Sequence, residues 1–279
     1  MSADRRARPG WLLYVVLWLL AAAFLFPLVW VGLSSLKTNF DALAHPEQLL
    51  PPAPQWSNYP SVWAVMDFPR QTLNSAIMAV SVTLGQVVLS ALAGYAFARL
   101  QFVGRDVLFV LVLATLIIPF EILFVPLFIM LSRAGLINSY AALILPSLAN
   151  PLSIFIFRQF FVTLPRELEE AMHIDGANTY RTFWSLALPL SGPAVATVCI
   201  LTFLSEWNAL LKPLVFTSSE DMRTLQVGLA FLNRGAFITE PQVAWLMAGV
   251  LLVSVPPVVF FLLAQNHFVR SIAATGLKG

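Results

Sequence analysis

The sequence predicts an all-α, polytopic membrane protein with six transmembrane helices, and its composition is the first reason. Of its 279 residues, 59% are hydrophobic and only 11% are charged, whereas an average soluble domain carries about a quarter charged residues. Several apolar runs reach the roughly 20 residues that a helix needs to cross a bilayer. The net charge of only +2 and the scattered arginines argue against nucleic acid as a partner.

The six apolar segments follow one another along the chain. They cover residues 11–33, 72–98, 107–131, 140–163, 190–213 and 243–265. The first segment follows several arginines, and Ala21-Ala22-Ala23 resembles a cleavage site, so a signal peptide is the alternative for it. Because this segment stays apolar through Leu33, beyond the about 7–15 residues of a signal-peptide core, we expect an uncleaved span.

The placement of lysine and arginine sets the orientation of the chain in the membrane. With the N-terminus inside, the cytoplasmic side collects more basic residues, namely Arg5, Arg6, Arg8, Arg99, Arg105, Arg158, Arg166, Arg181, Arg270 and Lys278. The external side receives fewer, namely Lys37, Arg70, Arg133, Lys212, Arg223 and Arg234. We therefore predict that both termini and residues 164–189 are cytoplasmic.

Two segments assigned to the external side have patterns of their own. In the loop 34–71, Leu50-Pro51-Pro52-Ala53-Pro54 predicts an extended stretch without helix. Trp56 and Trp63 follow it and suit the membrane–water boundary, and docking of an external protein is the alternative. The apolar run 225–232 is too short to span, so we expect a short interfacial or re-entrant helix.

Residues 164–189 differ from the rest because they are charged and amphipathic and lie between two apolar segments. Pro165 suits the first turn of a helix, where its missing N–H costs nothing. Three carboxylates near this start, Glu167, Glu169 and Glu170, complement the helix dipole. An apolar stripe recurs at helical spacing in Leu164, Leu168, Ala171 and Met172.

The same stretch contains signals for a turn and a second helix. Asp175-Gly176 predicts the end of the first helix, because glycine takes a left-handed C-terminal position without strain. We expect a second helix from Asn178 to Leu188, closed by Pro189. The pattern fits an element presented to a soluble partner and equally fits an amphipathic helix that lies on lipid headgroups.

The spelling of this element resembles a known motif. Glu170-Ala171-Met172, followed by Gly176 and by Leu186-Ala187-Leu188-Pro189, is similar to the coupling "EAA loop" of permease subunits in binding-protein-dependent ABC importers. Met172 stands where the family pattern has alanine, and Leu186 replaces an isoleucine. Further stretches resemble the carbohydrate-uptake branch of that family and its maltose-type and glycerol-3-phosphate-type inner permeases: Ala93–Arg99 with Gly104-Arg105, Ala142–Pro146, Glu206-Trp207-Asn208 and Phe268–Gly279.

The resemblance implies the type I permease fold of ABC importers and two parts of the chain. Residues 1–70 would comprise the N-terminal cytoplasmic tail, the first transmembrane helix and an external loop, and residues 71–279 the permease core with its coupling loop at 164–189. By family, the residues that dock on an ATPase subunit would be Leu168, Glu170, Ala171, Met172, Asp175, Gly176 and Ala177.

The resemblance also implies a function and partners. The chain would be the non-catalytic membrane subunit of an ATP-driven importer in a bacterial or archaeal plasma membrane, translocating a carbohydrate that an external solute-binding protein delivers. Glycerol-3-phosphate or another polar solute is the alternative. Its partners would be two ATP-binding subunits, a second homologous permease and membrane lipid. ATP and magnesium would bind to the partner subunits, with no cofactor in this chain.

Polar residues within the apolar segments are the candidates for a solute pathway, because ionisable groups at membrane depth are costly and commonly functional. Glu121 lies in the third segment, flanked by Pro119 and Pro126, which we expect to kink the helix. In the fifth segment, Glu206, Trp207 and Asn208 combine a carboxylate, an indole and an amide, the groups suited to binding sugars. The alternative is that these residues only tie helices together. Asn74, Ser75, Thr83 and Gln86 are weaker candidates.

Two other classes of protein are less consistent with the sequence. A secondary transporter would be expected to contain inverted repeats, and none is recognisable. A membrane enzyme is disfavoured because the histidines, His45, His173 and His267, form no metal-binding spacing and no lysine follows glycine in a phosphate-binding loop. Cys199, the only cysteine, excludes an internal disulfide and a cysteine-cluster metal site. We therefore expect neither catalytic residues nor a metal site.

Overall fold

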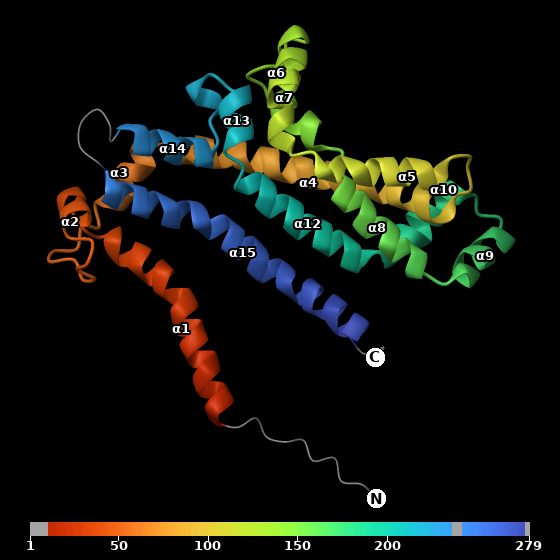
Figure 1. Ribbon diagram of the computed structural model, residues 1–279, viewed down its shortest axis with the longest axis horizontal. Helices are drawn as coiled ribbons and strands as arrows, with labels where there is room; N and C mark the ends of the chain where they lie inside the picture. The colour runs from red at the N-terminus through yellow and green to blue at the C-terminus, as the bar shows by residue number, and fades with distance from the viewer. Residues whose placement is uncertain (1–10, 236–241, 277–279) are drawn as a thin grey trace, which may run out of the picture. The chain divides into compact units, whose positions relative to one another are not determined.

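A computed structural model describes residues 11–235 and 242–276, and every regular element in these ranges is helical (Figure 1). The predicted all-α class is therefore confirmed for the described residues. The chain falls into two compact units, Met1–Phe68 with Leu229–Ser254 and Pro69–Gly228 with Val255–Gly279. Some basic residues on which the predicted orientation depends lie outside the described residues, namely Arg5, Arg6, Arg8 and Lys278.

The helices are distributed over the two units. The first unit contains α1 (Trp11–Ser34), α2 (Asn39–Ala44) and α3 (Asn58–Val65). The chain passes between the units within α14 (Leu225–Gly235) and within α15 (Val243–Gly276). The second unit is built from α4 (Phe68–Arg99), α5 (Arg105–Ala114), η1 (Thr115–Ile117), η2 (Phe120–Leu123), α6 (Phe124–Arg133), α7 (Tyr140–Ile144), η3 (Leu145–Ser147), α8 (Pro151–Thr163), α9 (Arg166–Ile174), α10 (Thr179–Thr182), η4 (Phe183–Ala187), α11 (Leu188–Leu190), α12 (Gly192–Trp207), α13 (Leu211–Phe216) and η5 (Glu220–Met222).

Six candidate spans correspond to the six predicted segments, but only three are single helices. These are α1, α4 and residues 243–263 of α15. The other three are pairs of helices bent by 91°, 46° and 73°, namely Arg105–Ile117 with Phe120–Arg133, Tyr140–Ser147 with Pro151–Thr163, and Thr179–Leu190 with Gly192–Trp207. The structure therefore allows up to six spans, as predicted, and three of them are broken. The fifth corresponds to its predicted segment only in Gly192–Trp207, because Thr179–Leu190 precedes that segment.

Proline and a capping asparagine account for two of the breaks. The predicted kink at Pro119 is confirmed, because the 91° bend lies between η1 and η2. Pro126 produces no kink, contrary to expectation, since it falls in the first turn of α6, where no N–H is needed. At the 46° bend, Oδ1 of Asn150 accepts hydrogen bonds from the N–H groups of Leu152 and Ser153 (2.9 and 3.2 Å) and so starts α8.

The fifth predicted segment, residues 190–213, extends too far. The helix α12 ends at Trp207, and a separate helix, α13, begins at Leu211. Hydropathy does not reveal this break because the residues around it remain mostly apolar. The break turns the side chain of Lys212 back toward Glu206, so the two side chains form an ion pair.

In the first unit, hydrogen bonds organise the loop after α1. The amide of Asn58 donates to the carbonyls of Ser35 and Lys37 (2.7 and 2.9 Å), and its Oδ1 accepts from the indole N–H of Trp245 (3.1 Å). The proline-rich stretch 51–54 is free of helix, as predicted. The run 225–232 forms the short helix α14, also as predicted.

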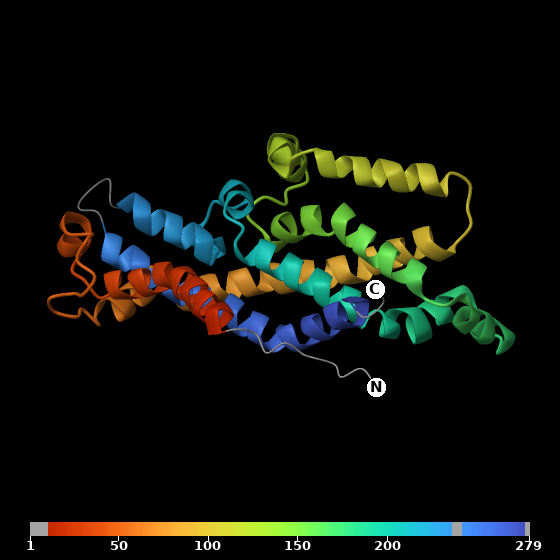
Figure 2. The same cartoon turned by 60° about the horizontal axis from the view of Figure 1, so that its bottom comes forward.

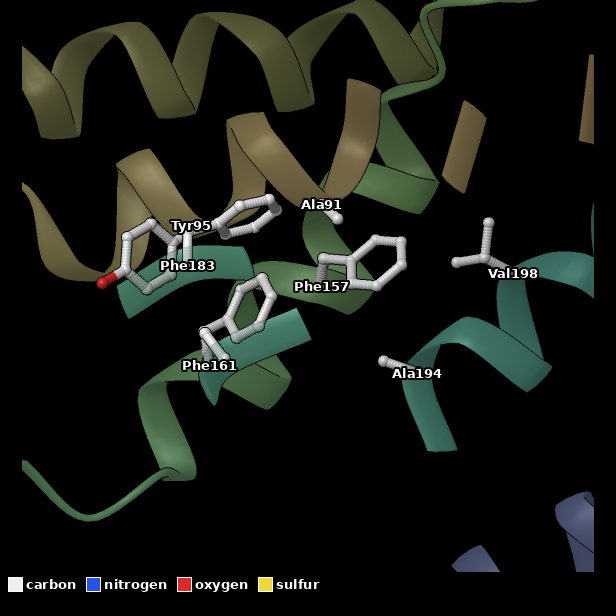
Figure 3. Close-up of a cluster of buried hydrophobic side chains, with 8 residues drawn as sticks. Ala91, Tyr95, Phe157, Phe161, Phe183, Ala194 and Val198 are labelled. Atoms are coloured by element: carbon white, nitrogen blue, oxygen red, sulfur yellow. The ribbon is translucent and has the colours of Figure 1, made fainter. Parts of the chain in front are cut away.

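The core of the second unit joins α4, α8, η4 and α12 (Figure 3). Its buried members are Ala91, Tyr95, Phe157, Phe161, Phe183, Ala187, Ala194 and Val198. Gly94 allows α4 and α8 to come close, because a Cβ at this position would lie 2.7 Å from Cβ of Phe157 and 2.8 Å from the backbone nitrogen of Arg158. Backbone cannot move aside as a flexible side chain can, so any side chain at position 94 would push the two helices apart.

Candidate functional site

Residues 164–189, which we call the coupling segment, form a helix, a turn and a second helix. Figures 1 and 2 both show α9 at one end of the second unit, beyond the ends of α5 and α8. The second helix begins where Oδ1 of Asn178 accepts a hydrogen bond from the N–H of Arg181 (2.8 Å). It does not end at Pro189, contrary to expectation, but continues to Leu190, because a wider π-helical turn (η4) precedes the proline.

The corner between the two helices has the geometry that the sequence predicts. Gly176 has φ +79°, the left-handed conformation that glycine adopts without strain. The N–H of Ala177 donates to the carbonyl of Met172 (2.9 Å) and the N–H of Gly176 to the carbonyl of His173 (3.0 Å), the two bonds of a Schellman motif. Nδ1 of His173 adds a hydrogen bond to the carbonyl of Ala177 (2.9 Å), so the turn is held on both sides.

Large apolar side chains of the coupling segment are exposed. Leu168 of the predicted stripe is 41% exposed, Ala171 is also exposed and Met172 is half-buried. Of the other residues that the resemblance assigned to docking, Glu170, Asp175 and Gly176 are exposed and Ala177 is buried. The sequence analysis missed three further exposed side chains, Ile174 (86%), Tyr180 (69%) and Trp184 (37%). The signal that would have identified them is the presence of aromatic and aliphatic residues in an otherwise charged stretch.

An ion pair attaches the coupling segment to α4. Nε of Arg99 lies 3.1 Å from Oε1 of Glu169, and both side chains are largely buried (7% and 15% exposed). Arg99 also donates a hydrogen bond from Nη2 to the carbonyl of Leu164. One guanidinium at the end of α4 therefore holds the start of the coupling segment at two points.

Aromatic packing makes a second attachment. The ring of Phe183 lies against Tyr95 of α4 and Phe161 of α8, with centroid distances of 5.3 and 6.4 Å (Figure 3). Tyr95 and Phe161 are themselves in edge contact at 5.5 Å. Because close-packed cores transmit displacement, a movement of the coupling segment reaches α4 and α8 directly.

A cleft of about 770 Å³ in the second unit brings two of the predicted pathway residues together. It is lined by Glu121 of η2 and Glu206 of α12, with further residues from α4, α5, η1, η3, α6, α8, α13 and the turn before α13. Its volume is in the range of small-molecule sites. Glu121 lies directly after the 91° bend, in η2.

Buried polar groups order one wall of this cleft. Nζ of Lys212 forms an ion pair with the carboxylate of Glu206 and donates to Oγ of Ser147 (2.7 Å). The carbonyl of Ser147 accepts from Nε2 of Gln86 (2.7 Å), and Oε1 of Gln86 accepts from the hydroxyls of Ser153 and Thr202 (3.1 and 2.8 Å). Lys212 is a residue that the sequence analysis counted only for its charge on the external side.

The other two predicted pathway residues do not line the cleft. Trp207 is buried and stacks on Phe203 at 5.6 Å. Asn208 is exposed, and its amide donates to the carbonyl of Leu204 (2.8 Å) at the end of α12. Trp207 therefore packs against a ring of its own helix, and Asn208 caps that helix.

Of the weaker candidates in α4, Gln86 lines the cleft, whereas Asn74 and Ser75 tie α4 to η5 and the segment that follows it. The amide of Asn74 donates to the carbonyls of Asp221 and Arg223 (2.7 and 2.8 Å), and Oγ of Ser75 accepts from the N–H of Leu225 (2.9 Å). Thr83 donates to the carbonyl of Ala79 in its own helix (2.7 Å). Within the part of the chain that the structure describes, no group of histidine, cysteine and carboxylate side chains is arranged to hold a metal ion.

Comparison with known proteins places these features in a family. Residues 86–274 match the family described as "Binding-protein-dependent transport system inner membrane component". The chain is 40% identical over 206 residues to the arabinooligosaccharides transport system permease protein AraQ of Halalkalibacterium halodurans, covering 74% of this chain and 73% of that one. It is 36% identical over 256 residues to the sn-glycerol-3-phosphate transport system permease protein UgpE of Yersinia pestis, covering 89% and 90%.

A solved structure has the same fold. One chain of a bacterial ABC transporter involved in the import of the acidic polysaccharide alginate superposes with a TM-score of 0.79 and 22% sequence identity. The match covers 96% of this chain and 99% of that one, so it includes both units and the coupling segment.

Proposed function

We propose that the solute of this chain is a carbohydrate. The premise is that the chain belongs to the family of inner-membrane components of binding-protein-dependent transport systems. In this family it is a non-catalytic, multi-pass permease subunit of an ABC importer. The relative AraQ, which is 40% identical, is named for the transport of arabino-oligosaccharides, and this supports the proposal. Glycerol-3-phosphate is the second candidate, since the relatives named for it match a larger part of the chain.

The proposed route of coupling is the segment 164–189. A binding-protein-dependent importer requires an ATPase, a binding protein and a second permease, and we assign the docking of one of two ATPase subunits to the exposed face of this segment. The observation that carries this assignment is the exposure of Leu168, Ile174 and Tyr180 on an element fixed to the core through Arg99 and Phe183. ATP-driven closure of the ATPase pair would then displace α4 and α8 and open the cleft alternately to either side.

One experiment tests the function and its solute together. The complete transporter in proteoliposomes, with its binding protein, should take up a radiolabelled arabino-oligosaccharide in the presence of ATP and should leave labelled sn-glycerol-3-phosphate outside. ATP hydrolysis should disappear when the ATPase subunit is omitted. Uptake of glycerol-3-phosphate alone would replace the proposed solute, and ATP turnover by this chain by itself would refute the assignment of hydrolysis to a partner.

The orientation of the coupling segment is tested separately. In a Cys199→Ala background, cysteines replacing the exposed Ser57 and Ser218 should react with an impermeant maleimide added to intact cells. A cysteine replacing Tyr180, which is 69% exposed, should react only after lysis. External labelling at position 180 would place the segment on the wrong side for an ATPase partner.

A further inference from the structure

We infer that the cleft around Glu206 and Lys212 selects an uncharged, polyhydroxylated solute and disfavours an anionic one, a conclusion that rests on the proposed role of this cleft in the solute pathway. It goes beyond that role because it assigns a charge class to the solute. The inference is based on the net charge of the described residues that line the cleft and on the contacts of Lys212, the one cationic residue among them.

Only three ionisable residues are found among the described residues that line the cleft, Glu121, Glu206 and Lys212. Lys212 and Glu206 form an ion pair with each other, and their side chains are 5% and 11% exposed. These two charges cancel, and Glu121 remains as an exposed carboxylate. The lining of the cleft therefore carries one net negative charge.

Lys212 is poorly placed to bind an anion. An ammonium group has three N–H donors, and Lys212 directs one to Glu206 and one to Ser147. Ser147 is in turn held by Gln86, whose oxygen is occupied by Ser153 and Thr202. One N–H is therefore left for a solute. Turning the ammonium group fully toward an anion would leave the carboxylate of Glu206 buried without a partner, which is strongly unfavourable.

A neutral solute meets no such cost. The hydroxyl groups of a sugar can donate to the carboxylate of Glu121, and the exposed Ser205 adds a hydroxyl to the lining. The remaining walls are largely apolar, with Phe120 and Phe124 among them, and suit the apolar face of a sugar ring. Apolar walls also weaken dielectric screening, which strengthens the repulsion between Glu121 and an anionic solute.

The test uses a pair of probes that differ in one group, methyl glucoside and methyl glucuronide, which carry a hydroxymethyl group and a carboxylate at the same carbon. The complete transporter in proteoliposomes carries Cys199→Ala and a reporter cysteine, Ser205→Cys, in the cleft. Labelling of this subunit by a fluorescent maleimide is measured after electrophoresis, against increasing concentrations of each probe.

We expect the glucoside to protect the reporter at a concentration about tenfold lower than the glucuronide, as follows from one like-charge interaction in a partly screened site. Glu121→Gln should reduce this difference to less than about threefold. The matched control, Glu220→Gln, removes a carboxylate that does not line the cleft and should leave the difference unchanged.

The other outcomes distinguish this inference from the proposed function. Equal protection by the two probes, or better protection by the glucuronide, would overturn the charge selectivity while leaving the cleft as a solute pathway. Protection by neither probe, in a transporter that accumulates labelled carbohydrate, would remove the solute from this cleft and overturn the inference alone. Protection by neither probe without carbohydrate uptake would overturn both.

Discussion

The coupling segment and the cleft differ in where their polar and apolar groups find partners. In the coupling segment, Leu168, Ile174 and Tyr180 face outward, and the buried Glu169 serves to attach the segment to α4. In the cleft, Lys212 and Glu206 satisfy each other below the surface. In the function that we propose, the first region docks another protein, whereas the second is internally balanced and offers a single carboxylate, Glu121, to a small solute.

Because of this difference, the two regions should respond differently to substitution. Substitutions on a surface that binds a partner should leave the free chain stable and should weaken only the binding of the partner. A balanced internal network fails within the chain itself, because removing one member leaves another unsatisfied.

The largest effect is expected from Gly176→Val in the coupling segment. A β-branched residue at φ +79° is strained by about 1–3 kcal/mol, and its methyl groups project toward whatever docks against the turn. No atom lies within 4 Å of a Cβ at this position, so the free chain should still insert normally. We expect membrane abundance to be retained, and co-purification of the ATPase subunit and solute uptake to fall by at least about tenfold.

The matched control for this prediction is Gly135→Val. Gly135 also has a positive φ, +67°, and also lacks neighbours within 4 Å, but it lies after α6, far along the chain from the coupling segment. Its backbone strain is equivalent, so the ATPase subunit should co-purify as with the wild type. Equal loss in both variants would attribute the effect to strain and remove the evidence for docking at Gly176.

A smaller but still large effect is expected from Lys212→Met in the cleft. This change leaves Glu206 buried beside a side chain without charge, and breaking a largely buried ion pair costs about 3–5 kcal/mol. We expect lower membrane abundance and a lower temperature of aggregation in detergent, even when the ATPase subunit is absent. The double variant Glu206→Gln with Lys212→Met should recover most of the stability, because it removes both charges.

The double variant also separates stability from solute handling. If it is as unstable as Lys212→Met, the ion pair is not what stabilises the wall of the cleft. If it is stable and still excludes the glucuronide, the charge of Glu121 is sufficient for selection.

The next effect in size is expected from Glu169→Gln, which tests whether the coupling segment depends on its attachment to α4. The substitution keeps the shape of the side chain and removes the charge that faces Arg99 at 3.1 Å. We expect the ATPase subunit still to co-purify, because the exposed apolar face is unchanged, while uptake per ATP hydrolysed falls about threefold. Glu167→Gln is the control, since Glu167 is exposed in the same helix. An unchanged ratio of uptake to hydrolysis in Glu169→Gln would exclude this ion pair from coupling.

The coupling segment was largely predictable from the sequence, because its signals are local. Gly176 takes the left-handed conformation that was predicted for the corner, and the second helix follows Asn178. Pro165 was predicted in the first turn of the first helix but stands at the N-cap, one residue before that turn. A further exception is Pro189, which the sequence places at the end of a helix. A π-helical turn accommodates it instead, and no local pattern distinguishes this from a helix end.

The cleft was only partly predictable, because its geometry depends on where apolar helices break. Hydropathy gave the segment 190–213 as one span, and the end of α12 at Trp207 reassigns Lys212 from the outer surface to a buried partner of Glu206. The contacts among Gln86, Ser147 and Thr202 join residues up to 116 positions apart in the chain. Contacts between residues so far apart could not be predicted from the sequence. Glu206 could be singled out as a functional candidate, because a carboxylate within an apolar segment is visible in the sequence itself.

The smallest effect is expected from Asn208→Ala, and it sharpens the boundary of the cleft. Asn208 stands beside Glu206 and Trp207 in the sequence and was for that reason a candidate for the solute pathway. The structure shows its amide capping α12 through the carbonyl of Leu204 (2.8 Å), with a longer contact to Gln226 (3.4 Å), outside the residues that line the cleft. Loss of an exposed hydrogen bond of this kind costs about 0.5–1.5 kcal/mol. Uptake of labelled oligosaccharide should therefore change less than about twofold. The glucoside should protect the Ser205→Cys reporter as it does without the Asn208→Ala substitution. A loss of reporter protection in Asn208→Ala at normal membrane abundance would extend the solute site beyond the cleft, to the end of α12.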